Sequence, residues 1–196
     1  RLGGYETHSS GRLPNGDVVM ALDGGLYTLD GQSLVEVDMD LPVPVQRVVT
    51  GKNELWLWDM GELFRWDGGS VSQISLPDYP YIYDFAASED RLYLSLPWLA
   101  VVDLSGDGLR TMYVDERMPT SMAIDSSANL WFVSDNQLFQ RRPMETIRPI
   151  ELPEAVRTVA GPEIWVEGES SLYRYHSASF SRHTVSGDGI VAVDGY

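Results

Sequence analysis

Short runs of apolar and aromatic residues recur along the whole chain, separated by turn-forming residues. The stretch ANLWFVSDNQLFQRRP, from Ala128 to Pro143, shows one unit, in which a Leu-Trp pair stands eight residues before a Leu-Phe pair. The first apolar position of the unit recurs, at spacings of 37, 37, 38 and 34 residues, as Val18, Leu55, Leu92, Leu130 and Ile164. The second apolar position recurs at similar spacings as Leu26, Leu63, Leu99, Leu138 and Leu172. Two series that agree predict five structural repeats.

Each repeat is expected to consist of short strands. β-Branched and aromatic residues alternate over a few positions between turn sequences, and no window of a dozen residues has a helical period. The second repeat shows four such runs, Val45 to Thr50, Glu54 to Asp59, Leu63 to Asp67 and Ser70 to Leu76. Four strands in about 40 residues are typical of a β-propeller blade. The runs expected to be innermost carry small residues, as crowding there requires, namely Ala86, Ala87, Ala123, Ala160 and Ala192.

The two ends of the chain suggest how the first blade is completed. The first repeat has no obvious inner strand, because the stretch before it, SSGRLPNG, is polar and rich in turn residues. Near the other end, Gly189 to Asp194 reads GIVAVD and resembles an inner strand. We therefore predict an all-β, five-bladed β-propeller of four-stranded antiparallel blades, with the ring closed by the C-terminal strand. Residues 1–16 would be an extension and residues 17–196 a single domain. The alternative is a fragment of a larger propeller.

Charge limits the classes of partner. The chain has 29 acidic and 14 basic residues and a formal net charge of -15 at pH 7. Such a field repels nucleic acids and anionic membrane surfaces, and no apolar run is long enough to predict membrane insertion. It favours a protein partner that carries a basic patch. Cysteine is absent from the sequence, so disulfides and thiol chemistry are not expected. We expect an extracytoplasmic location.

The strand motifs resemble a known class of repeats. Asn129-Leu130-Trp131-Phe132 followed by Leu138-Phe139 is similar to the repeats of sensor-type β-propellers of two-component regulators. Glu62-Leu63-Phe64-Arg65-Trp66-Asp67 and Ser171-Leu172-Tyr173-Arg174-Tyr175-His176 look like the second half of that motif. The resemblance covers about 180 residues and implies propeller blades in a sensor or interaction module.

Catalytic motifs are not evident in the sequence. No nucleophile elbow, zinc-protease helix or phosphate-binding glycine loop occurs. The three histidines, His8, His176 and His183, have no motif around them, and Asp103 to Gly108 lacks the remaining ligands of a calcium loop. Propeller glycosidases use two or three acids but need long loops for a substrate cleft. We therefore predict a protein that is not an enzyme and uses no cofactor or metal.

Candidate binding residues fall in the turns of one predicted face. One acid follows the second strand in each of four repeats: Asp23, Asp59, Asp135 and Glu167. These acids either form a ring on this face or occur there because acidic residues such as Asp favour turns. The third repeat and its boundaries add residue types that are enriched in binding hot spots, with charged neighbours: Asp78, Tyr79, Tyr81, Trp98, Glu116 and Arg117.

Two binding functions compete for this face. A lectin with equivalent sites would repeat its ligand-binding residues in every repeat, whereas here the loops differ. We therefore predict a non-catalytic protein-binding or sensor module and keep a carbohydrate-binding propeller as the alternative.

Overall fold

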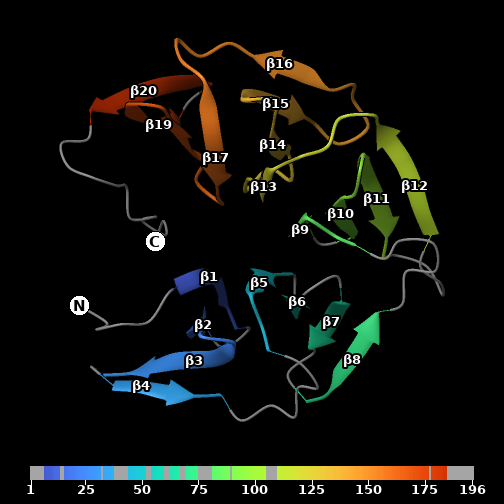
Figure 1. Ribbon diagram of the computed structural model, residues 1–196, viewed down its shortest axis with the longest axis vertical. Coiled ribbons are helices and arrows are strands. Elements are labelled where there is room, and N and C mark those ends of the chain that lie inside the picture. Colours follow the sequence, from blue (N-terminus) through green and yellow to red (C-terminus); the bar gives the residue numbers. More distant parts are fainter. Residues whose placement is uncertain are drawn as a thin grey trace. The chain divides into compact units, whose positions relative to one another are not determined.

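The computed structural model describes residues 7–13, 16–31, 33–37, 44–51, 54–59, 62–66, 69–74, 81–88, 90–104, 110–176 and 178–184. Within these ranges the chain forms twenty strands in five four-stranded antiparallel sheets (Figure 1) and no helix. In the part of the chain so described, there is accordingly no helix long and apolar enough to cross a membrane. The predicted fold class, an all-β protein of five four-stranded blades, is confirmed.

The chain divides into two compact units, at Arg1–Ile82 and Tyr83–Tyr196. The first unit holds two sheets. One consists of β1 (Thr7–Arg12), β2 (Val18–Leu22), β3 (Gly25–Asp30) and β4 (Ser33–Glu36). The other consists of β5 (Arg47–Thr50), β6 (Leu55–Asp59), β7 (Glu62–Trp66) and β8 (Val71–Ile74). The second unit holds three sheets. The first consists of β9 (Asp84–Ala87), β10 (Arg91–Ser95), β11 (Leu99–Asp103) and β12 (Arg110–Asp115), and the second of β13 (Ser121–Ile124), β14 (Leu130–Ser134), β15 (Gln137–Arg141) and β16 (Arg148–Ile150). The third consists of β17 (Val156–Ala160), β18 (Trp165–Gly168), β19 (Ser171–His176) and β20 (Ser179–Thr184). We number the sheets as blades 1 to 5 in chain order.

The apolar ladders of the sequence mark the middle strands of each blade. Leu55 and Leu130 begin β6 and β14, whereas Leu63 and Leu138 lie in β7 and β15. All five residues of β14 are buried, which requires cover on both faces of the strand. One cluster of buried residues joins blades 4 and 5, and another joins blades 1 and 2. Burial on both faces explains why these strands read as runs of apolar residues.

Two of the turns between second and third strands have the geometry of two-residue hairpins. Asp23 and Gly24 have φ values of 48° and 83°, and Asp135 and Asn136 have 50° and 60°. Consecutive residues with positive φ match a type I′ turn, which favours Asp, Asn and Gly. Turn chemistry therefore accounts for two of the four acids in the predicted ring.

The first strand of blade 1 differs from the prediction. β1 lies in the stretch expected to be an extension, and it pairs with β2 along Thr7–Arg12. The assignment of Gly189 to Asp194 to that edge is therefore wrong, because β1 occupies the edge of β2 that this segment was to take. Gly189 to Asp194, with Ala192, lies outside the described residues.

Hydrogen bonds to blade 2 explain how so polar a sequence forms β1. The backbone N–H of Val48 donates to Ser9 Oγ at 2.6 Å, and the N–H of Arg12 donates to Thr50 Oγ1 at 2.6 Å. A Cβ on Gly11 would lie 3.2 Å from Val48 Cγ2, so a small residue is needed there. β1 is held by its polar groups and its close approach to β5 rather than by apolar burial.

The same kind of link joins the first strands of the second unit. Asp84 Oδ2 accepts a hydrogen bond from the N–H of Met122 at 2.7 Å, and Ser121 Oγ accepts one from the N–H of Val159 at 3.1 Å. Each acceptor lies on the first strand of one blade and each donor on the first strand of the next. These strands contain Ala86, Ala87, Ala123 and Ala160, as the crowding argument predicted.

Candidate functional site

A group of partly exposed side chains gathers where blade 3 begins and ends. The N–H of Tyr83 donates to the carbonyl oxygen of Ser95 at 2.8 Å. The hydroxyl of Ser95, which is fully buried, donates to the carbonyl oxygen of Pro119 at 2.5 Å. These two bonds bring the connection into β9 together with the connection that leaves β12.

Three of the residues predicted to bind a partner lie at this same end. Trp98 is half-buried in the turn between β10 and β11, Glu116 is exposed, and Arg117 is half-buried. The Arg117 guanidinium donates to Asp115 Oδ1 at 2.6 Å and lies 4.7 Å from the centre of the Phe139 ring. Arg117 therefore joins blade 3 to blade 4, and much of its side chain already has an intramolecular role.

Two residues that the sequence reasoning missed complete this surface. Tyr83 is 51% exposed and Met118 is 37% exposed. Tyr83 could have been recognised, because it alternates with Tyr81 around the buried Ile82 as strand-like backbone requires. Met118 carries no sequence signal beyond its position before Pro119. We call Tyr83, Trp98, Glu116, Arg117 and Met118 the blade-3 end.

The remaining predicted binding residues are not included in the blade-3 end. Asp78 and Tyr79 lie outside the described residues. Tyr81 is 65% exposed and is the next-to-last residue of the first unit. Its exposure agrees with a role on a surface, but that role stays a prediction.

Two of the four acids of the predicted ring, Asp23 and Asp135, occupy equivalent turn positions, and the other two do not. Asp59 is the last residue of β6 and pairs with Glu62, whereas Asp135 follows the last pair of β14, Ser134 with Gln137. Glu167 pairs with Leu172 and lies one residue before the end of β18. The acids therefore differ in backbone position, because Asp23 and Asp135 lie in turns whereas Asp59 and Glu167 lie in strands.

An acid at the corresponding end of blade 5 has a structural role. Glu154 Oε1 accepts a hydrogen bond from the Tyr173 hydroxyl at 2.7 Å, and Oε2 accepts bonds from the N–H and hydroxyl of Ser170 at 2.8 Å each. The bond from Tyr173, followed by those from Ser170, lowers the pKa of Glu154 from 4.5 to about 2. Burial and the bond to Glu154 raise the pKa of Tyr173. Glu154 thus fixes the connection that enters blade 5.

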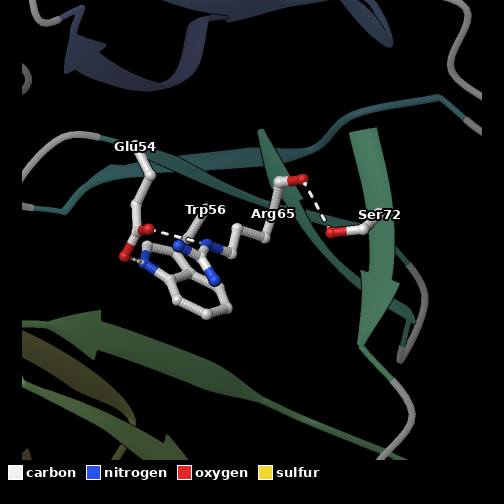
Figure 2. A network of polar contacts seen from close by, with 4 residues as sticks. All are labelled: Glu54, Trp56, Arg65 and Ser72. Atoms are coloured by element: carbon white, nitrogen blue, oxygen red, sulfur yellow. Dashed lines mark hydrogen bonds and ion pairs between the residues drawn. The ribbon is translucent and has the colours of Figure 1, made fainter. Parts of the chain in front are cut away.

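A different polar network lies in blade 2, where β6 begins (Figure 2). Glu54 Oε2 accepts a hydrogen bond from Arg65 Nε at 2.6 Å, and Glu54 Oε1 accepts one from Trp56 Nε1 at 3.2 Å. The hydroxyl of Ser72 donates to the carbonyl oxygen of Arg65 at 3.4 Å. Glu54 is 9% exposed, so its charge is largely buried and balanced by these donors.

Blade 5 has the same residue types at the same sequence spacing, namely Glu163, Trp165, Arg174 and Ser181. Arg174 Nη2 donates to Glu163 Oε2 at 2.5 Å, and the Ser181 hydroxyl donates to the Arg174 carbonyl oxygen at 3.3 Å. The side chain of Glu163 is 47% exposed, however, against 10% for Glu54. We call the blade-5 network open, because its carboxylate is exposed, and the blade-2 network closed, because its carboxylate is nearly buried.

The open network borders a cavity of about 280 Å³ between blades 4 and 5. Its lining comes from the β13–β14 turn, the β17–β18 turn and the end of β19, and includes Asp125, Ser126, Ser127, Glu163, Arg174 and His176. Within the described ranges, no group of three or more His, Cys, Asp or Glu residues is arranged to hold a metal ion.

Comparison with known proteins identifies the fold. No family model matches the sequence, and no curated protein matches it either. Among solved structures, virginiamycin B lyase from Staphylococcus aureus is similar, with a TM-score of 0.65 and 16% identity over 91% of this chain and 70% of that chain. The chain has the β-propeller fold.

Two further similar structures belong to other kinds of propeller. One, BT3049 from B. thetaiotaomicron, is described as the extracellular domain of a hybrid two-component system, and it matches with a TM-score of 0.68 and 14% identity. That match covers 92% of this chain but 28% of BT3049. The other, YCF48 from Cyanidioschyzon merolae, matches with a TM-score of 0.64 and 13% identity over 95% of this chain and 73% of that one. YCF48 is also known bound to D1 peptide. The resemblance to sensor propellers is thus confirmed at the level of the fold.

Proposed function

We propose that this propeller is a non-catalytic interaction module that binds another protein through the blade-3 end. The observation that carries the proposal is the exposed pair Tyr83 and Met118, which Ser95 brings together through its bonds to Tyr83 and Pro119. Aromatic and methionine side chains are enriched in protein interfaces, where they supply contact area. Trp98 extends this surface.

The charge of the surface suggests the chemistry of the partner. Arg117 is paired with its neighbour Asp115, and when Asp115 is counted with the blade-3 end, the exposed Glu116 leaves the surface with a net negative charge. The whole chain carries a net charge of -15. We therefore expect the partner to present a basic patch, because complementary fields raise the rate of encounter.

The solved structures support binding in general. YCF48 binds a peptide, so a propeller of this shape serves recognition in another protein. BT3049 is the extracellular domain of a two-component system. We propose an extracytoplasmic location on the same ground. Virginiamycin B lyase shows that the fold also supports an enzyme. Against a catalytic role for Asp115 at the blade-3 end, its carboxylate is already bonded to Arg117.

Site-specific photo-crosslinking in the native host tests the proposal. A photoreactive phenylalanine replaces Tyr83 in one variant and Met118 in another. Both positions should give the same protein adduct of discrete mass. Tyr113 is the matched control, since it is 64% exposed but lies in the outer strand β12.

The outcomes separate the proposal from its rivals. An adduct from positions 83 and 118, with none from position 113, supports it. An equal yield of the same adduct from position 113, or no protein adduct from positions 83 and 118, contradicts it.

A further inference from the structure

We propose that the cavity between blades 4 and 5 binds a small neutral ligand rich in hydroxyl groups, such as a polyol or a monosaccharide. This site lies at the opposite end of the strands from the blade-3 end. It goes beyond the proposed protein-binding function and does not depend on it.

The two copies of the polar network differ in how far they are buried. In blade 2, Arg65 Nε donates to a nearly buried carboxylate, and the indole of Trp56 donates to the same group. In blade 5, Arg174 meets Glu163 through Nη2, and the Glu163 side chain stays 47% exposed beside the cavity that both residues line. This ion pair therefore keeps polar atoms within reach of a ligand in the cavity, whereas the pair in blade 2 has a nearly buried carboxylate.

The charges of the lining favour a neutral ligand. Asp125 and Glu163 are acidic and Arg174 is basic, so the lining is net negative when His176 is neutral. An anion would meet two carboxylates and the field of the whole chain, and a cation would meet the Arg174 guanidinium. A neutral molecule avoids both penalties.

The free hydrogen-bonding groups favour hydroxyls. The Asp125 carboxylate already accepts four bonds, from the N–H groups of Ser127 and Asn129 and from the side chains of Asn129 and Trp131. It therefore serves to hold the β13–β14 turn. The other polar residues of the lining include Arg174, which can donate, Glu163, which can accept, and Ser126 and Ser127, whose hydroxyls can do both. A ligand hydroxyl also does both, so vicinal hydroxyls satisfy donor and acceptor together.

The size of the cavity restricts the ligand further. Its volume of about 280 Å³ lies at the lower limit of the usual range for ligand sites. One small molecule, rather than a peptide segment, is therefore expected.

Nuclear magnetic resonance titration with defined probes tests this site. The probes are myo-inositol and glucose, with glucuronate, glucosamine and N-methylacetamide as the anionic, cationic and amide comparisons. We expect myo-inositol or glucose to shift the amide signals of residues 125–127, 163–164 and 174–176 with millimolar affinity, and the other three probes to bind more weakly.

Variants assign any binding to the cavity. Arg174→Gln should weaken binding about tenfold or more. Arg65→Gln is the matched control, because it changes the equivalent residue of the closed network in blade 2 and should leave binding unchanged. Ser126→Leu fills the cavity from an exposed turn without altering either network, so it should abolish binding even if Arg174→Gln folds poorly.

Three results would overturn the proposal. They are tighter binding of a charged or amide probe, no shift at the lining residues with any probe at up to about 50 mM, and equal loss of binding in Arg65→Gln. None of these results bears on the blade-3 end, so the two proposals stand or fall separately.

Discussion

At the scale of single residues, burial decides the role of the same residue type at equivalent positions. Glu54 and Glu163 occupy equivalent positions beside a Trp and an Arg, but only Glu54 is nearly buried. The sequence spacing reveals the repetition of the network. The difference in exposure depends on how neighbouring turns pack, which spacing does not contain.

We predict that Glu54→Ala lowers the free energy of unfolding by about 1–3 kcal/mol, because it leaves the Trp56 indole and the Arg65 guanidinium without their acceptor. Urea denaturation measures the change. Glu163→Ala is the matched control and should cost less than about 0.5 kcal/mol, since the exposed pair is screened by water. Equal losses in the two variants would show that the two networks are equally structural.

The lowered pKa of Glu154 predicts that the free energy of unfolding depends on pH in the acidic range. The carboxylate is favoured in the folded state, so its contribution is fully present above its ordinary pKa of 4.5 and is lost as the pH falls towards about 2. Glu154→Gln should therefore be less stable than the parent above pH 4.5, and the difference should shrink below it. Urea denaturation of both proteins across this pH range measures the difference. A further variant, Tyr173→Phe, should raise the pKa of Glu154, because it removes the hydroxyl that donates to the carboxylate. A difference in stability that does not change with pH would contradict this assignment.

At the scale of elements, apolar periodicity predicted the middle strands but not the first one. The ladders through Leu55, Leu63, Leu130 and Leu138 mark buried strands, because these side chains are covered on both faces. β1 has no such signal. Its residues are fixed by hydrogen bonds to β5 and by a close approach at Gly11, which a reading of polarity does not detect.

Gly11→Val tests the role of β1. A larger side chain would press on Val48 and Thr50, and we expect a loss of about 1–3 kcal/mol in the free energy of unfolding. The amide of Val48, which donates to Ser9, should also exchange its hydrogen faster. Unchanged stability and unchanged exchange would mean that β1 does not form the edge of blade 1.

At the scale of the whole molecule, the repeat predicted the number of blades, whereas the position of the binding surface needed the structure. Trp98, Glu116 and Arg117 were found from residue type and predicted turns. The role of Arg117 as a link to Phe139 depends on contacts between blades. The ring of acids stays a prediction, and the one-residue offset between Asp59 and Asp135 relative to their strand pairs is not evident from the repeat spacing. Tyr83 and Met118 are brought together by Ser95, far from either in the sequence.

The central claim is that the blade-3 end is the protein-binding surface. Its most direct test is the affinity of the crosslinked partner, once purified, for the parent, for Tyr83→Ala/Met118→Ala and for the control Tyr113→Ala, measured by calorimetry. We predict that the double variant loses about 2 kcal/mol or more, roughly thirtyfold in Kd, while Tyr113→Ala binds like the parent. Parental affinity in the double variant, or an equal loss in Tyr113→Ala, would contradict the claim.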